Sequence, residues 1–238
     1  MADMCLLGGT RYLEQVKTPA FYRRIRQYLI DQYERHRESN SKKNAWDWFD
    51  WKKLGVGSVK VSISKEITGR EAVISGFYDA DADRNHQACI GVVFHVPSKF
   101  RKQPPTSYMA LHLADLLVHE YNHKRQARKR GWEPAPEPLP YQSMTDDKMV
   151  EYLASTDEID SYAINIADEL YDHRKAFRQR WNNLFTKTKN SSREDSYSDQ
   201  LWHYTQYFTL EDEVTRRLMK KIYKRYQEMD KYRKAIKK

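Results

Sequence analysis

The sequence predicts an α+β fold, with a small and mostly antiparallel sheet between long helices. Three runs of strand length within residues 58–96 are rich in β-branched and aromatic residues, and turn-forming segments separate them. On either side of this region, apolar residues recur every three or four positions, which is the period of an amphipathic helix. The aromatic content of 13% is too high for a disordered chain.

The three predicted strands are SVKVSIS, EAVISGFYD and QACIGVVFHV. The segments ITGR and DADADRN lie between them and contain the residues that favour turns, so we expect hairpin-like connections. The acidic DADAD segment lacks the glycine and the closing glutamate of a calcium-binding EF-hand loop. It is therefore expected to be a plain solvated turn.

Helices are expected before and after the sheet region. The first covers residues 11–38, and the aromatic segment 45–51 after it is expected to anchor on the core. Residues 145–185 predict one or two helices and residues 186–199 a polar loop. Residues 200–238 are helical again and end in a basic stretch.

One further helix is predicted within residues 104–131. Pro104 and Pro105 stop the preceding segment, Thr106 or Ser107 is the expected N-cap, and Gly131 is the expected residue after the C-terminus. Lysine and arginine fill the last turn, where they complement the helix dipole. The Pro-rich segment EPAPEPLPY after it predicts a connection without regular structure.

This helix carries the motif HExxH, formed by His119, Glu120 and His123. Two histidines at i and i+4 lie on one helical face and can bind one metal ion, while the glutamate can take a proton from metal-bound water. Polar residues spaced three or four apart continue along the same helix, and each would cost about 1–3 kcal/mol if buried without a partner. We therefore favour a functional stripe over a water-facing one: His112, Asp115, His119, Asn122, His123 and Gln126.

A catalytic zinc ion takes three protein ligands and leaves one position for water, so a third ligand is expected. No third histidine follows in HEYNHKRQARKRG. A carboxylate on the helical segment downstream is the alternative. The candidates are Glu158, Asp157, Asp160 and Glu151.

With a glutamate on a later helix, the chain resembles the gluzincin family of HExxH zinc metallopeptidases. It is also similar to short HExxH proteins of phage genomes, over about residues 88–170. The resemblance implies a zincin-like fold, with His119, His123 and Glu158 as zinc ligands and Glu120 as general base. It further implies that the strand Ala88–Val96 is an edge strand that pairs with extended substrate.

The sequence departs from this family at one position. Thermolysin-like enzymes carry an aspartate four residues after the third ligand, where this chain has Tyr162. The departure distinguishes the chain from the thermolysin-like subfamily, and Asp157, Asp160 and Asp115 remain as candidate partners for a zinc-bound histidine.

The resemblance implies a zinc-dependent endopeptidase that acts on a polypeptide substrate. The tetrahedral oxyanion needs a further hydrogen-bond donor, for which His203 and Tyr204 are the candidates, with a packed aromatic cluster as the alternative. The implied organisation has three parts: an N-terminal helical extension with the aromatic segment (1–57), a zincin-like catalytic domain (58–185), and a polar loop with a basic C-terminal helix (186–238).

The formal net charge is +9, which favours contact with an acidic protein or nucleic acid, or simply gives a basic solvated surface. The rival function is accordingly that of a non-catalytic, basic structural or nucleic-acid-associated protein, including a viral one, that keeps a zincin-like fold. A purely structural zinc site is a third alternative. It would need a fourth ligand such as His112 or His203.

Cys5 and Cys89 are isolated and form no disulfide framework. The sequence shows no signal peptide, and no apolar run approaches the roughly 18 residues of a membrane span, so no membrane contact is expected. We therefore expect a cytoplasmic protein. If the chain is phage-encoded, the host cytoplasm or the virion is the expected place.

Overall fold

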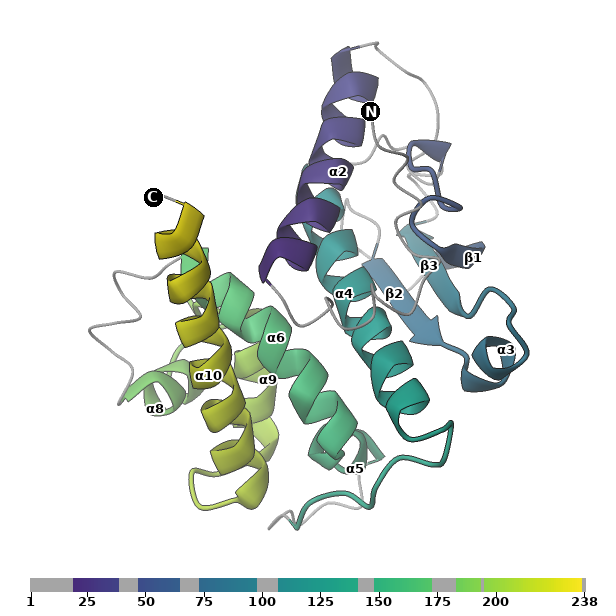
Figure 1. Ribbon diagram of the computed structural model, residues 1–238. Coiled ribbons are helices and arrows are strands. Elements are labelled where there is room, and N and C mark those ends of the chain that lie inside the picture. Colours follow the sequence, from purple (N-terminus) through teal and green to yellow (C-terminus); the bar gives the residue numbers. More distant parts are fainter. Residues whose placement is uncertain are drawn as a thin grey trace. The chain divides into compact units, whose positions relative to one another are not determined.

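The structure of the protein is a computed structural model. It describes residues 19–38, 47–64, 73–97, 107–140, 148–172, 183–193 and 195–236. The chain divides into two compact units, Met1–Glu133 and Pro134–Lys238. The first contains a sheet and helices, and the second is helical (Figure 1). The α+β class is thereby confirmed, whereas the three-part division at residues 57 and 185 stays a prediction.

The sheet of the first unit has three strands, β1 (Val56–Ser64), β2 (Val73–Tyr78) and β3 (Ile90–Pro97), close to the predicted positions. The strand order is β1-β3-β2, with β1 parallel and β2 antiparallel to β3. The predicted antiparallel pairing of consecutive strands is therefore confirmed for β2 and β3 and wrong for β1, which makes the sheet mixed. The predicted edge strand is wrong as well, because β3 is paired on both sides.

The acidic DADAD segment is not a solvated turn. It forms the short helix α3 (Ala80–Arg84), whose N-cap Asp79 accepts a hydrogen bond from the backbone nitrogen of Ala82 at 2.9 Å. Asp83 in this helix is only 1% exposed. The prediction failed because two of the partners of Asp83, Arg128 and Trp132, lie 45 and 49 positions away along the chain.

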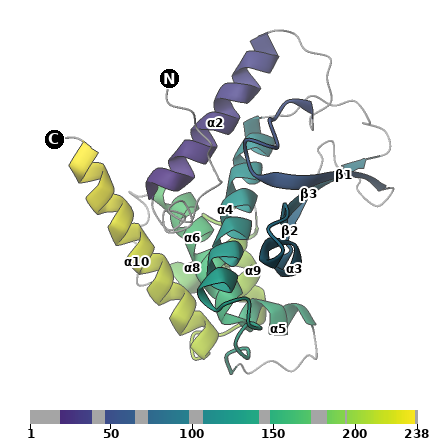
Figure 2. The same ribbon diagram turned by 45° about the vertical axis from the view of Figure 1, so that its right-hand side comes forward.

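Two long helices belong to the first unit, α2 (Pro19–Glu38) and α4 (Ser107–Lys129), and both confirm predicted helices. Residues 11–18 and the predicted N-cap Thr106 lie outside the described residues. Gly131 follows α4 with a φ of +66°, a left-handed conformation that favours glycine, as predicted. In both views α4 lies between α2 and the sheet (Figures 1 and 2).

The core of the first unit lies between the sheet and α4. Val92 and Phe94 of β3 are fully buried, as are Leu113 and Leu117 of α4. The aromatic segment joins this core, since Phe94 packs edge-on to the Trp51 ring at 5.9 Å. Within the described part of segment 45–51, the expected anchoring of aromatic residues is confirmed, because Trp48 and Phe49 are buried.

The second unit contains α5 (Lys148–Ala154), α6 (Thr156–Asp172), α8 (Leu184–Lys189), α9 (Asp199–Tyr207) and α10 (Glu213–Ile236). Residues 133–140 before it have no regular structure, as predicted. The predicted loop 186–199 begins inside α8, which corrects that boundary.

The predicted helix 200–238 is two helices. The chain turns between α9 and α10, where Asp212 accepts hydrogen bonds from the backbone nitrogen of Thr209 at 2.7 Å and from its hydroxyl at 3.0 Å. α6, α9 and α10 share one apolar core that includes Ile159, Leu201 and Leu218. None of the helices in the described residues is long and apolar enough to cross a membrane.

Candidate metal centre

The rotation of α4 about its axis is fixed by Tyr121, inside the HExxH motif. Its ring packs edge-on to Phe21 of α2 at 5.8 Å, and its hydroxyl donates to the carbonyl of Leu54. Burial raises the pKa of Tyr121, so the hydroxyl remains a donor. Because Tyr121 faces the core, its neighbours His119 and His123 point to the other side of the helix.

The C-terminal half of α4 is held by Asp83. Its carboxylate accepts from Arg128 at 2.8 and 2.6 Å and from the indole of Trp132 at 3.2 Å, and Lys124 lies 3.3 Å away. Tyr78 of β2 also donates to it at 2.9 Å. Asp83 therefore ties the end of α4, after the HExxH motif, to the sheet.

The polar stripe of α4 is largely buried, as a functional stripe would be. Asp115, His119, Asn122 and Gln126 are each less than 9% exposed. Asp115, one turn before His119, accepts a hydrogen bond of 2.7 Å from Tyr22 of α2. The alternative that the stripe simply faces water is therefore wrong.

His119 and His123 lie on one face of α4, as their spacing predicts. Their Nε2 atoms are 2.9 Å apart and their ring centroids 4.7 Å apart. Glu120 between them is 6% exposed. The motif thus presents two imidazoles to one point and keeps a carboxyl group on the same helix.

In the second unit, Glu158 belongs to the first turn of α6. Its backbone nitrogen donates to the hydroxyl of Ser155 at 3.2 Å, so Ser155 is the N-cap. A glutamate at this position often caps the helix by accepting from the N-cap nitrogen. Here the nitrogen of Ser155 donates to the carbonyl of Tyr152 at 3.1 Å instead, so that role is already filled. The cap thus fixes the first turn of α6, from which the side chain of Glu158 projects.

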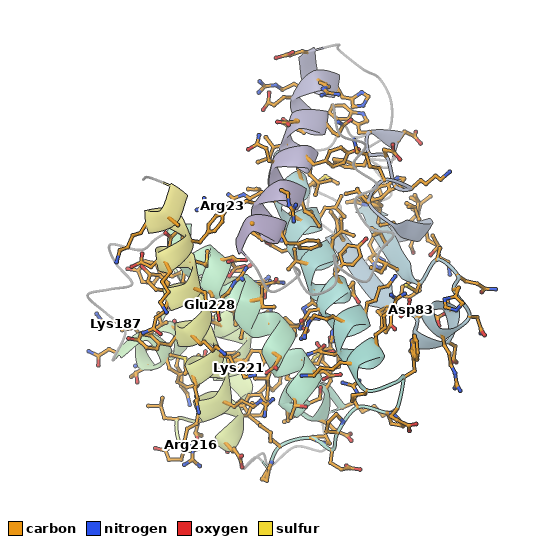
Figure 3. All side chains as sticks on the ribbon, in the orientation of Figure 1. Arg23, Asp83, Lys187, Arg216, Lys221 and Glu228 are labelled. Atoms are coloured by element: carbon orange, nitrogen blue, oxygen red, sulfur yellow. The ribbon has the colours of Figure 1, made fainter. Side chains whose placement is uncertain are left out.

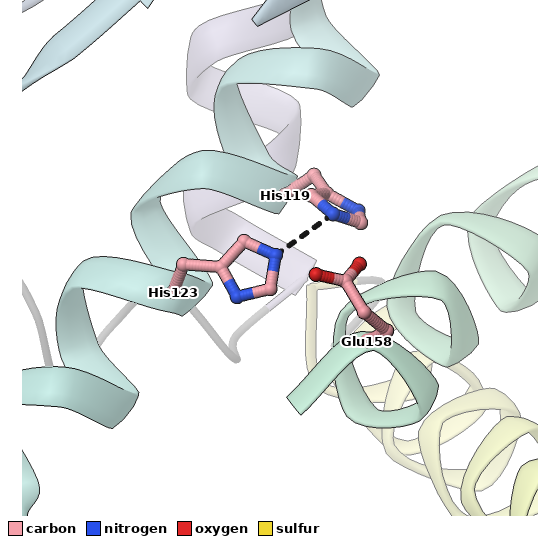
Figure 4. A group of neighbouring side chains, drawn as sticks. All are labelled: His119, His123 and Glu158. Carbon is pink, nitrogen blue, oxygen red and sulfur yellow. Dashed lines mark hydrogen bonds between the residues drawn. The ribbon is translucent and has the colours of Figure 1, made fainter. Parts of the chain in front are cut away.

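The ligand atoms of His119, His123 and Glu158 all lie within 4.8 Å of one another. Figure 4 shows both imidazoles and the carboxylate turned toward one another. Two histidines and a glutamate are a donor set that zinc accepts in catalytic sites. These residues therefore fit the metal that the motif predicts.

No family model, curated protein or solved structure matches this chain. The resemblance to gluzincins consequently rests on the motif and on the geometry of its residues. The fold family, the zinc ion and the activity that follow from it stay predictions.

The other candidate ligands have other surroundings. Asp160 accepts from Lys221 at 2.8 Å and from Arg217 at 3.4 Å, both on α10. Glu151 is exposed on α5. Among the described residues, the group that can hold a metal contains Glu158 and neither Asp157, Asp160 nor Glu151.

The two predicted oxyanion donors lie on α9. Tyr204 is fully buried, its hydroxyl donates to the carbonyl of Leu153 at 3.1 Å, and its ring packs edge-on to Tyr162 at 5.6 Å. His203 is exposed beside the Trp202 ring, and its pKa is lowered by partial burial and by the charge of Arg193. These surroundings match the packed aromatic alternative for Tyr204.

Tyr152 is a residue that the sequence reasoning missed. Its hydroxyl lies near Glu158 and Tyr162, and 43% of the residue is exposed. Burial of the hydroxyl and then the neighbouring charges raise the pKa of Tyr152, which keeps it protonated. The sequence signal was weak, because Tyr152 lies on α5, ahead of the helix that carries Glu158.

Proposed function

We propose that this protein is a zinc-dependent metallopeptidase in which His119, His123 and Glu158 hold the metal. The observation that supports the proposal is the convergence of these three side chains within 4.8 Å, on the helix that also carries Glu120 and on α6. Bound there, zinc would activate a water molecule and polarise the substrate carbonyl. Glu120 would accept the proton on its carboxylate and deliver it to the leaving amine.

A catalytic site is favoured over a structural zinc site. Structural zinc normally has four protein ligands. Within the residues described, no fourth histidine, cysteine or carboxylate joins the group, and that includes His112 and His203. Three ligands leave one coordination position for water.

The substrate would add to the sheet at β2. This strand lies at the end of the strand order and contacts α4. Extended peptides commonly bind by pairing their backbone with such an edge strand. β2 would thus take the role that the resemblance implies for Ala88–Val96.

The proposal is tested first by zinc content. Chelator-treated protein, reloaded with zinc and dialysed, is expected to hold about one zinc ion per chain, as judged by elemental analysis. His123→Ala and Glu158→Ala should each weaken zinc binding by more than about 100-fold. Loss of a residue that only supports a ligand costs up to about 100-fold, and loss of a ligand itself should cost more. Glu151→Ala removes an exposed glutamate and should keep the metal. A folded wild type without zinc would overturn the proposal.

We propose Tyr152, whose hydroxyl lies near the ligand Glu158, as the donor for the oxyanion in place of Tyr204, and Tyr152→Phe tests this role. Loss of this hydroxyl is expected to lower kcat roughly 10²- to 10³-fold, as loss of one oxyanion donor does, with zinc content and KM little changed. Tyr204→Phe is the matched variant. It should cost about 1–3 kcal/mol of stability, because the carbonyl of Leu153 loses its donor, and leave kcat unchanged. The reverse pattern in peptide-cleavage assays would assign the oxyanion role to Tyr204.

A further inference from the structure

The outward face of α10 is a row of basic residues. Arg217, Lys221 and Arg225 turn toward α6, where they pair with Asp160 and Asp168 at 2.8–3.4 Å. The opposite side is exposed and carries the residues that we call the α10 basic face: Arg216, Lys220, Lys224, Lys231 and Lys234.

These five cationic side chains are not neutralised by the described acidic residues of the second unit. In the part of the chain that the structure describes, none of them has an ion-pair partner. The acidic residues of α10 are few: Glu213 at its start, and Glu228 and Asp230, which are partly buried. Figure 3 shows Lys221 toward α6 and Arg216 at the outer side of the helix. The α10 basic face thus keeps an uncompensated positive charge.

The spacing of the face fits a regular polyanion. Arg216, Lys220 and Lys224 follow one another at four-residue intervals, which is about 6 Å along a helix axis. Successive phosphates of one DNA strand are separated by ~3.4 Å along the duplex axis, so each cation would meet about every second phosphate. From Arg216 to Lys234 the face extends for about 27 Å on one straight element.

The apolar side of α10 is buried in the second unit, which excludes the usual mode by which a helix binds a membrane surface. A membrane-surface helix inserts its apolar face between lipids. Here Val214, Leu218 and Ile222 are fully buried in the core of the second unit, and Tyr226 and Met229 are at most 5% exposed. Only the charged side is open to a partner.

We propose that the α10 basic face binds the phosphate backbone of double-stranded nucleic acid without reading its sequence. A duplex is favoured over a single strand because single-strand sites rely on several aromatic rings that stack with bases. Within the described residues of the face, Tyr223 is the one exposed ring, at 44%. The inference does not depend on the zinc site, since α10 carries none of its ligands.

The test measures binding of a labelled duplex of about 20 base pairs by fluorescence anisotropy at several salt concentrations. Arg216→Gln/Lys220→Gln/Lys224→Gln is expected to raise Kd at least about 10-fold and to lower the slope of log Kd against log salt by roughly 2.7, about 0.9 for each lost contact. The control Lys52→Gln/Lys60→Gln/Arg84→Gln removes the same charge from exposed residues of the first unit. It should change Kd by less than about 2-fold.

Three results would overturn the proposal. The first is no salt-dependent binding by the wild type. The second is an equal loss in the control variant, which would indicate net charge alone. The third is binding of a single strand, polyglutamate or anionic vesicles as tightly as the duplex. Circular dichroism of both variants checks that the helices are intact.

Discussion

Glu120→Gln is expected to lower the rate of peptide hydrolysis about 10³-fold while the protein keeps its zinc. General-base catalysis contributes roughly 10²- to 10⁴-fold, and an amide cannot accept the proton that the carboxylate of Glu120 would take. Glutamine has nearly the same size, so the buried position, 6% exposed, should accept it. The loss should therefore fall on kcat, because no zinc ligand is changed.

Cleavage of a peptide library by the wild type first identifies the best substrate. The rate of its hydrolysis is then measured for the wild type and for Glu120→Gln. Elemental analysis of the same samples gives the zinc content. Glu151→Gln makes the same chemical change at an exposed glutamate of α5 and should keep full activity. If Glu120→Gln cleaves as fast as the wild type, Glu120 is not the base. If it also loses zinc, the carboxylate has a structural role in the site.

Asp83→Ala is expected to destabilise the first unit by about 3–5 kcal/mol, the range for breaking a buried ion pair by removing one partner. The carboxylate is 1% exposed and has Arg128 and Lys124 as cationic partners, with Tyr78 and Trp132 as further donors. Removing it leaves these groups without their common acceptor. Asp81→Ala in the same short helix changes an exposed aspartate and should cost less than about 1 kcal/mol.

The contribution of Asp83 to the stability of the first unit should depend on pH. Burial alone would raise the pKa of its carboxyl group, but the hydrogen bond from Arg128 and the charge of Lys124 outweigh burial and hold the pKa well below its usual value. A depressed pKa stabilises the folded state above the unfolded pKa, about 3.9, and this stability is lost as the pH falls toward the folded pKa. The free energy of unfolding in urea, monitored by hydrogen exchange of the α4 amides, should thus be lower for Asp83→Ala than for the wild type by the full amount at pH 7. The difference should be smaller below about pH 4. A constant deficit would mean that Asp83 acts through packing alone.

Sequence patterns were enough to locate most elements of the fold. The helical period predicted α4 with both histidines of the HExxH motif on one face, and runs of β-branched and aromatic residues located three strands. The pairing of the strands could not be predicted, because such a run indicates a strand and does not show which strand is its neighbour. The break before α10 was missed because it depends on hydrogen bonds from Thr209 to Asp212.

The candidate site was predicted in part for a similar reason. His119, Glu120 and His123 are close in sequence, so a helix alone brings them together. The candidate third ligand could be any of several carboxylates in the sequence, and among the described residues the group that could hold a metal contains Glu158. Asp83 was taken for a surface residue, because Arg128 and Trp132 lie 45 and 49 positions away along the chain.

The parallel pairing of β1 with β3 has a consequence for how the chain folds. Val56 pairs with Ile90, a separation of 90 − 56 = 34 residues, and β2 and α3 lie between them in sequence. The antiparallel partners β2 and β3 are nearer neighbours, and loop closure costs less for the shorter connection. During synthesis, β1 must therefore wait for β3 to leave the ribosome before it has any partner in the sheet. We expect β1, with Val61 and Ile63 at 40% and 48% exposure even in the native sheet, to be prone to mispairing in that interval.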